Sequence, residues 1–229
     1  MNAITKEFEQ WSRFETIFFT LSLILVLACS VIKGDEILAI IASVFGLIYT
    51  FSAGKGKIYC YFFGIISTIA CGYIAFRSAG LFGTAILYFS CYLPMEIIGI
   101  LEWRKHLIQN TNEIIKTQLG KKDFLIFCIV IYTCALMSSS LFKLWGDSSP
   151  IIDSFVFMTS IAAMFMTIKR CIEQWALWTI SNILSVYMWF EVFMNGEKTF
   201  SIFVIRIVYL VLGIYFFLKW RIQLKSQRV

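Results

Sequence analysis

Four side chains on one apolar stretch have the types and spacing of a binding site inside a membrane: Trp175, Trp178, Asn182 and Ser185. Spacings of three, four and three residues place them on a single face of a helix. The stretch 175–194 is long enough to cross a bilayer, where an amide that faces lipid is costly. We therefore expect Asn182 to face protein or a water-filled cavity, beside the two indoles. The pattern predicts non-covalent binding of a small molecule that contains a ring.

The same side chains also have a structural interpretation. Trp178 and Asn182 fit ordinary helix packing, in which the amide bonds a neighbouring helix. Trp175 lies near one end of the stretch and fits an anchor at the membrane surface. The residues of this stretch alone leave both interpretations open.

The composition assigns the chain to a class of proteins. Of its 229 residues, 59% are apolar and only 15% are charged, which is too apolar for a soluble domain of this size. Continuous alternation of apolar and polar residues is absent, which argues against a β-barrel. We predict an all-α integral membrane protein with eight transmembrane helices. The expected spans are 15–32, 36–53, 58–76, 81–101, 124–142, 153–168, 175–194 and 200–218.

The positions of lysine and arginine predict the orientation. With eight spans, fifteen of these residues fall on the side that holds both termini and four on the other side. Positive residues concentrate on the cytoplasmic side, so both termini are expected there. The net charge of +6 then reflects membrane topology, and no nucleic-acid partner is expected.

A faint internal repeat divides the chain. A shift of 117 residues lays 61–104 over 178–221 without a gap, and it pairs Trp103 with Trp220 and Arg104 with Arg221. The shift also pairs Tyr61 with Trp178, and it pairs Thr68 with Ser185. Copies that run in the same direction are typical of one class of transporter, whose substrate site lies between the copies.

The repeat gives predicted boundaries. They are an extra N-terminal helix in 1–35, a first three-helix repeat in 36–104, a linker with a linking helix in 105–150, a second repeat in 151–221 and a tail in 222–229. The polar part of the linker, 105–122, fits a surface helix that joins the two halves.

Three blocks in order resemble the Pnu-type vitamin transporters, whose best-known members carry nicotinamide riboside. The blocks span most of the chain from about residue 45 to residue 220. They are Tyr61-Phe62-Phe63-Gly64; Tyr92-Leu93-Pro94-Met95 with Gly99 and Trp103; and Glu173, Trp175, Trp178 and Asn182.

The resemblance implies a fold and a mode of action. It implies a 3+1+3 arrangement like that of the SWEET sugar carriers, in a homotrimer in the bacterial inner membrane. It also implies facilitated diffusion, with a cytoplasmic kinase that phosphorylates the vitamin and traps it. The chain departs from the family pattern at Phe89, Glu96 and Ile100. Thiamine, riboflavin or a nucleoside therefore remain alternative ligands, with thiamine the first of them.

Two charged residues, Glu96 and Arg206, lie well inside predicted spans. Glu96 fits a site that attracts a cationic ligand, but it also lies close enough to the end of its span to reach the membrane surface. Arg206 aligns with Phe89, seven residues from the level of Glu96, or about 10 Å along a helix. A direct ion pair between Glu96 and Arg206 is therefore not expected.

The predicted substrate site consists of Trp178, Asn182, Trp175, Ser185, Glu96, Tyr61, Thr68 and Tyr92. We expect no cofactor, metal or catalytic residue. A membrane-embedded enzyme is the distant alternative, because such enzymes cluster carboxylates or histidines, whereas Asp147, Asp153 and the single His106 are scattered along the sequence.

Overall fold

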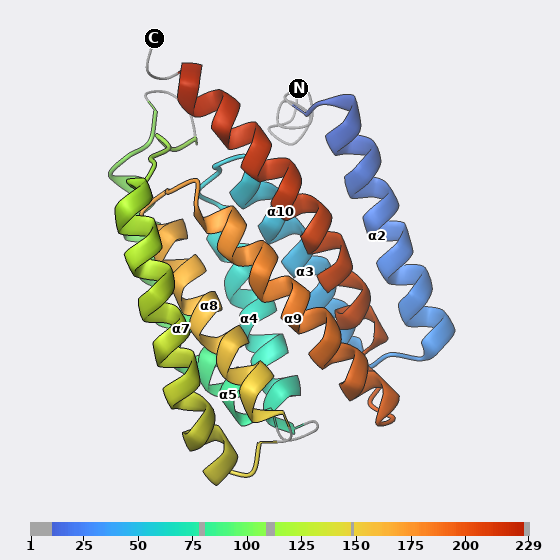
Figure 1. Cartoon of the computed structure of the whole chain (residues 1–229). Helices are drawn as coiled ribbons and strands as arrows, with labels where there is room; N and C mark the ends of the chain where they lie inside the picture. Colours follow the sequence, from blue (N-terminus) through green and yellow to red (C-terminus); the bar gives the residue numbers. More distant parts are fainter. Residues whose placement is uncertain (1–10, 78–80, 109–112, 148, 227–229) are drawn as a thin grey trace.

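The computed structural model describes residues 11–77, 81–108, 113–147 and 149–226, which form a bundle of long helices (Figure 1). In this described part eight helical segments are long and apolar enough to cross a membrane, as predicted. They are α2 (Arg13–Lys33), α3 (Ile37–Gly54), α4 (Cys60–Arg77), the composite segment of α5 (Phe82–Ile86), η1 (Leu87–Tyr92) and α6 (Leu93–Arg104), α7 (Lys121–Leu144), α8 (Pro150–Ile168), α9 (Gln174–Met194) and α10 (Phe200–Ser226).

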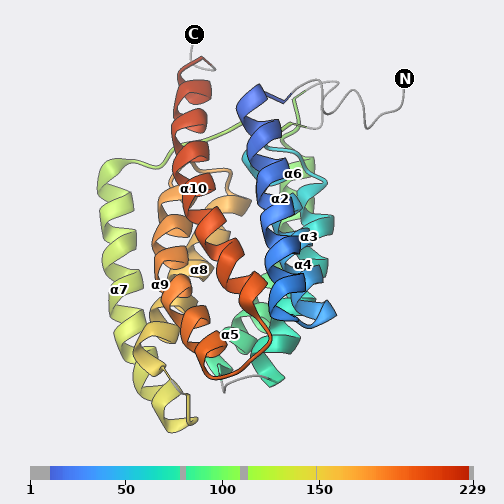
Figure 2. The same ribbon diagram turned by 90° about the vertical axis from the view of Figure 1, so that its right-hand side faces the viewer.

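The helices α3 to α6 and α8 to α10 form the body of the bundle. Helix α7 lies at its edge in both views, whereas α2 lies at the opposite edge in Figure 1 and in front of the bundle in Figure 2. Helix α2 begins and α10 ends at the same end of the bundle, which we call the terminal side. The loops that follow α3, α6 and α8 lie on this side as well, in agreement with the predicted topology.

The composite segment contains a π-helix where a proline interrupts the normal hydrogen-bonding pattern. Pro94 has no amide hydrogen, and its ring would collide with the carbonyl group of Ser90 in a regular α-helix. The wider turn of η1, directly before Pro94, relieves this conflict. It also places Tyr88 and Tyr92 next to each other, with ring centroids 5.3 Å apart.

Helix α2 is attached to the bundle through one buried carboxylate. Glu15 is 1% exposed and belongs to a capping box with Ser12. Its Oε2 atom lies 3.3 Å from Nζ of Lys55, at the end of α3, and its Oε1 atom accepts hydrogen bonds from Lys219 and Tyr215 of α10. One acidic side chain therefore joins three helices.

The linker on the terminal side does not form the predicted surface helix. In its described part the backbone runs extended between two loops: Ile114 N donates to the carbonyl of Gly56 (3.1 Å), and Thr117 N donates to that of Arg170 (2.9 Å). Ile172 N donates back to the carbonyl of Thr117 (3.0 Å). The prediction was wrong because these amides donate hydrogen bonds to other loops, whereas the amides of a helix donate to carbonyl groups within the same segment.

The loops after α3 and α8 have matching conformations. Gly56 and Arg170 both have a left-handed backbone, with φ of 72° and 61°. Tyr61 packs edge-on against Trp103 at 5.0 Å, and Trp175 packs edge-on against Trp220 at 5.8 Å. These matched positions make Tyr61 the counterpart of Trp175, at an offset of 114 residues.

The gapless shift of 117 residues is therefore wrong at the start of α4 and α9, although it holds for Trp103 and Trp220. Helix α4 has 18 residues and α9 has 21, which accounts for the change of offset along the chain. The offset of 114 residues pairs Thr68 with Asn182. The division into two three-helix repeats with a SWEET-like arrangement stays a prediction.

Replacement of Glu15 tests how α2 is held. Glu15→Gln removes the negative charge that faces the ammonium groups of Lys55 and Lys219, and we expect it to destabilise the protein by about 3 kcal/mol. Thermal unfolding of the detergent-purified protein measures the effect. Glu102→Gln is the matched control, because the pair of Glu102 with Lys105 lies at the surface. An equal, small shift for both variants would contradict the proposed role of Glu15.

Candidate functional site

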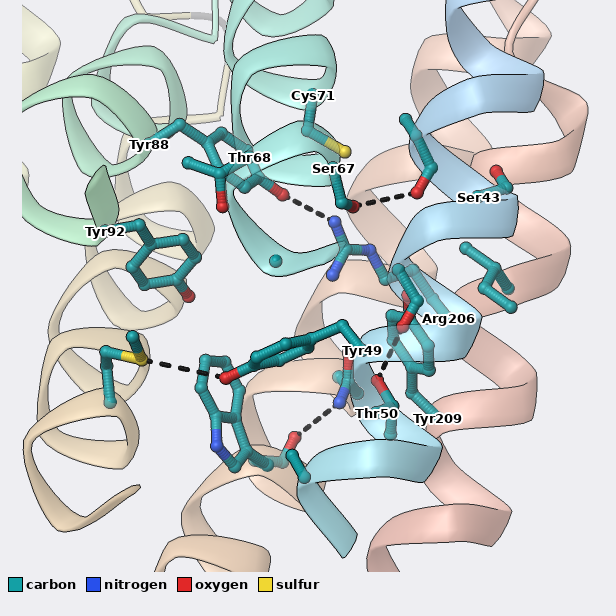
Figure 3. A pocket seen from close by; sticks show the side chains of 18 of the residues that line it. Ser43, Tyr49, Thr50, Ser67, Thr68, Cys71, Tyr88, Tyr92, Arg206 and Tyr209 are labelled. Atoms are coloured by element: carbon teal, nitrogen blue, oxygen red, sulfur yellow. Dashed lines mark hydrogen bonds between the residues drawn. The ribbon is translucent and has the colours of Figure 1, made fainter. Parts of the chain in front are cut away.

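A cavity lies inside the bundle, between α3 and α4 on one side and η1, α6, α8, α9 and α10 on the others (Figure 3). Aromatic rings and a small number of polar groups share its walls. The lining includes Tyr49, Thr68, Tyr88, Tyr92, Glu96, Trp175, Trp178, Asn182, Arg206 and Tyr209.

Six of the eight predicted site residues line this cavity, and two do not. Thr68, Tyr92, Glu96, Trp175, Trp178 and Asn182 belong to its walls. Tyr61 is completely buried against Trp103, and a Cβ atom on Gly99 would lie 2.3 Å from its ring, so this contact requires a glycine. Ser185 is also buried, outside the cavity lining.

Trp178 and Asn182 lie one turn apart on α9, as their spacing predicted. The indole Nε1 of Trp178 donates to Oγ1 of Thr167 on α8 (3.1 Å), which fixes the ring. The ring of Tyr92 meets that indole at 5.9 Å and 65°. Asn182 Nδ2 donates to the carbonyl of Trp178 (2.8 Å), and its Oδ1 atom has no hydrogen-bond partner among the described residues. An acceptor therefore remains available next to two aromatic rings.

Trp175 is more deeply buried than Trp178. It is 3% exposed, and its ring lies 5.1 Å from Phe216 and 5.8 Å from Trp220. The indole sits between helices and does not face lipid, so the structure gives no support to a role as a surface anchor. The residue nevertheless also borders the cavity.

Glu96 faces the cavity and has one hydrogen-bonding partner. It is 3% exposed, and its Oε1 atom accepts a hydrogen bond from Oγ1 of Thr68 (2.9 Å). A Cβ atom on Gly64 would lie 2.8 Å from the same oxygen, so the glycine leaves room for the carboxylate. Its Oε2 atom has no partner within the described part of the chain. Glu96 and Arg206 form no ion pair there, as expected from their levels in the membrane.

Sequence reasoning missed part of the cavity wall. Tyr88 could have been found, because it stands four residues before Tyr92 and close to Pro94. Tyr209 could have been found as well, because the shift of 117 residues pairs it with Tyr92. Tyr49 belongs to an apolar helix without a motif, and nothing in the sequence marks it as a cavity residue. The hydroxyl of Tyr49 reaches across to the sulfur of Met164 (3.9 Å), which connects α3 to α8.

The described residues contain no group of three or more His, Cys, Asp or Glu side chains placed to hold a metal ion. Asp153 is used structurally: its carboxylate accepts hydrogen bonds from the backbone amide (3.0 Å) and the hydroxyl of Thr84, and so joins α8 to α5. What the cavity offers is aromatic surface, hydroxyl groups, the two amides of Asn182 and Gln174, one carboxylate and one guanidinium, which suits reversible binding.

Known proteins resemble this chain over most of its length. A nicotinamide riboside transporter from Neisseria mucosa is 29% identical over 222 residues, 93% of this chain and 82% of its own length. The transporter of the same name from Haemophilus influenzae is 30% identical over 213 residues, 92% of this chain and 90% of its own length. A crystal structure of a vitamin B3 transporter, 28% identical, superposes with a TM-score of 0.81 and covers 94% of both chains.

A family model described as nicotinamide mononucleotide transporter matches residues 36–222. The matched region covers the seven spanning segments from α3 to most of α10 and the whole cavity lining, and it leaves out α2 and the last residues. The chain therefore belongs to the nicotinamide mononucleotide transporter family.

Proposed function

We propose that this protein binds nicotinamide riboside in the cavity and carries it across the membrane into the cell. The observation that carries the proposal is the group of Trp178, Tyr92, Asn182 and Glu96 on one wall of a membrane-embedded cavity. The similar proteins from Neisseria mucosa and Haemophilus influenzae are named as nicotinamide riboside transporters, which supports this choice of ligand.

The side chains on this wall match the nicotinamide half of the ligand. The ring carries a fixed positive charge, which the face of an indole and a nearby carboxylate both attract. Trp178 and Tyr92 supply the aromatic surface, and Glu96 supplies the negative charge. The carboxamide of the ligand donates to the Oδ1 atom of Asn182. Thiamine also has a ring cation and remains the second candidate.

The riboside suits this cavity better than the mononucleotide named in the family description. A phosphate group adds about two negative charges at neutral pH. Arg206 is the only Lys or Arg among the described residues that line the cavity, and Glu96 contributes a negative charge to the same space. One guanidinium is a weak match for a phosphate dianion when a carboxylate lies in the same cavity.

The proposed mechanism is facilitated diffusion with alternating access. The two halves, α3 to α6 and α8 to α10, rock about the cavity and expose it to one side of the membrane at a time. A cytoplasmic kinase then phosphorylates the vitamin and prevents its exit, and the transport itself contains no covalent step. The excess of Lys and Arg on the terminal side supports a cytoplasmic location of both termini in the bacterial inner membrane. A homotrimer with one path in each protomer is part of the proposal.

Substitutions of Trp178 and Asn182 are expected to differ in character. Trp178→Ala weakens binding of every ligand with a ring, because stacking contributes about 0.5–2 kcal/mol and tolerates different rings. Asn182→Leu mainly weakens binding of the ligand that forms a hydrogen bond with its amide, by about 0.5–1.5 kcal/mol. Calorimetric titration with nicotinamide riboside and thiamine measures both effects.

Two matched controls separate this effect from general damage. Trp145→Ala and Asn195→Leu change the same residue types at exposed positions outside the cavity, and parent-like affinities are expected for both. If folded Trp178→Ala and Asn182→Leu proteins also bind like the parent, the α9 face serves only for packing.

Uptake into proteoliposomes tests the proposed function and its driving force. With a facilitated carrier, nicotinamide riboside equilibrates across the membrane, and an imposed pH gradient does not raise the internal concentration above the external one. Glu96→Gln is expected to reduce the affinity for this cationic ligand while uptake remains non-concentrative. Concentrative uptake that depends on the pH gradient and disappears in Glu96→Gln would show a proton-coupled carrier instead. Absence of uptake by the parent would refute the proposed function.

A further inference from the structure

Arg206 places a positive charge in the cavity that the proposed contacts do not use. It lies on α10, and its guanidinium points into the space between α4, η1 and α10 (Figure 3). Its Nη2 atom donates to the hydroxyl of Tyr88 (2.6 Å), and its Cζ atom lies 5.7 Å from the centre of the Tyr209 ring. No carboxylate pairs with it within the described residues, and its Nε–H has no partner there.

An unpaired guanidinium inside a membrane protein is costly, so its position calls for an explanation. Two tyrosines hold it without neutralising it, and only one of its five N–H groups makes a hydrogen bond to the described residues. The other donors need acceptors that this part of the protein does not provide. A ligand with several oxygen atoms can provide them.

A row of aromatic rings connects Arg206 to the site proposed for the nicotinamide ring. Tyr88, which bonds Arg206, packs against Tyr92 at 5.3 Å, and Tyr92 packs against Trp178 at 5.9 Å. Arg206 and Trp178 therefore lie at opposite ends of this row. Glu96 belongs to the same cavity and does not pair with Arg206. The cavity thus contains two separate charges of opposite sign.

This separation determines how a ligand with a cationic ring lies in the cavity. The ring is attracted by Glu96 and repelled by Arg206, so it occupies the end near Trp178. The uncharged half of the ligand must then face Arg206. In nicotinamide riboside this half is the ribosyl group, whose hydroxyl oxygens accept hydrogen bonds.

We infer that Arg206 is a specificity-determining residue that binds the hydroxyl oxygens of the ribosyl group and orients the ligand along the row of tyrosines. This inference rests on the proposed function and extends it, because it explains how the carrier distinguishes a riboside from other molecules with the same ring. Tyr88 is a positioning residue, since it acts on the ligand through Arg206.

The test compares two ligands that share the cationic carboxamide ring, nicotinamide riboside and 1-methylnicotinamide, which has no ribose. Calorimetry and competition up to millimolar concentrations measure both affinities on the full chain in detergent. Arg206→Met is expected to weaken riboside binding about tenfold or more, because hydrogen bonds from a charged donor are lost. It is expected to leave binding of 1-methylnicotinamide within about twofold of the parent. Arg104→Met, at the exposed end of α6, is the matched control and should change neither affinity.

Every other outcome contradicts either the inference about Arg206 or the proposed function. The inference is overturned if folded Arg206→Met keeps the riboside affinity of the parent, or if it loses affinity equally for both ligands. It is also overturned if the parent binds the riboside but not 1-methylnicotinamide. A parent that binds neither ligand overturns the proposed function instead. If Arg206→Met does not fold, Tyr88→Phe removes the hydrogen bond that holds the guanidinium and keeps the ring. A selective loss of riboside affinity is expected there too, and unchanged affinity would contradict the inference.

Discussion

The structure depends on one constraint: a polar side chain in a membrane interior must find a partner or face a cavity. Glu15 satisfies it with partners, since two lysines and a tyrosine surround its carboxylate. Asn182, Glu96 and Arg206 satisfy it differently, because each keeps at least one polar atom without a described partner and all three line the same cavity. The three side chains that line the cavity therefore keep polar atoms that a ligand can bind.

Two crossed hydrogen bonds on the terminal side join helices α3 to α6, the first half in the proposed mechanism, to helices α8 to α10, its second half. Trp103 Nε1, at the end of the first half, donates to the carbonyl of Thr167 in the second half (2.9 Å). Trp220 Nε1, at the end of the second half, donates to the carbonyl of Gly54 in the first half (2.6 Å). Lys116 of the linker lies 5.1 Å from the ring of Trp220, and burial lowers the pKa of its amine to about 8.

The hydrogen bonds on the terminal side restrict movement of the two halves relative to each other. The linker also bonds the two left-handed loop residues, Gly56 and Arg170, so both halves share contacts with one extended segment. Any movement that opens the cavity toward the terminal side must break or bend these bonds. The opposite side has a different connection, in which Asp35 accepts hydrogen bonds from the backbone amides of Phe200 and Ser201 and so joins the loop after α2 to the start of α10.

Much of the fold was predictable because membrane spans depend on length and composition. The face of α9 was also predictable, since the spacing of Trp178 and Asn182 determines that they share it. The prediction of a surface helix in 105–122 was wrong because hydrogen bonds to distant loops determine the conformation of this segment. A local sequence pattern does not contain information about such bonds. The exclusion of Tyr61 from the cavity was equally hidden, because it depends on its close contact with Gly99 on another helix. A gapless comparison of the halves could not detect three additional residues in α9.

The central claim is that the cavity beside Trp178 recognises a small vitamin with a cationic ring. The most direct measurement is a titration of the purified protein with nicotinamide riboside, nicotinamide mononucleotide, thiamine, riboflavin and adenosine, followed by calorimetry and by tryptophan fluorescence. The account predicts the tightest binding for nicotinamide riboside and the next tightest for thiamine, with a fluorescence change that is lost in Trp178→Phe. Saturable binding of riboflavin or adenosine alone, with none of the cationic ligands, would contradict it.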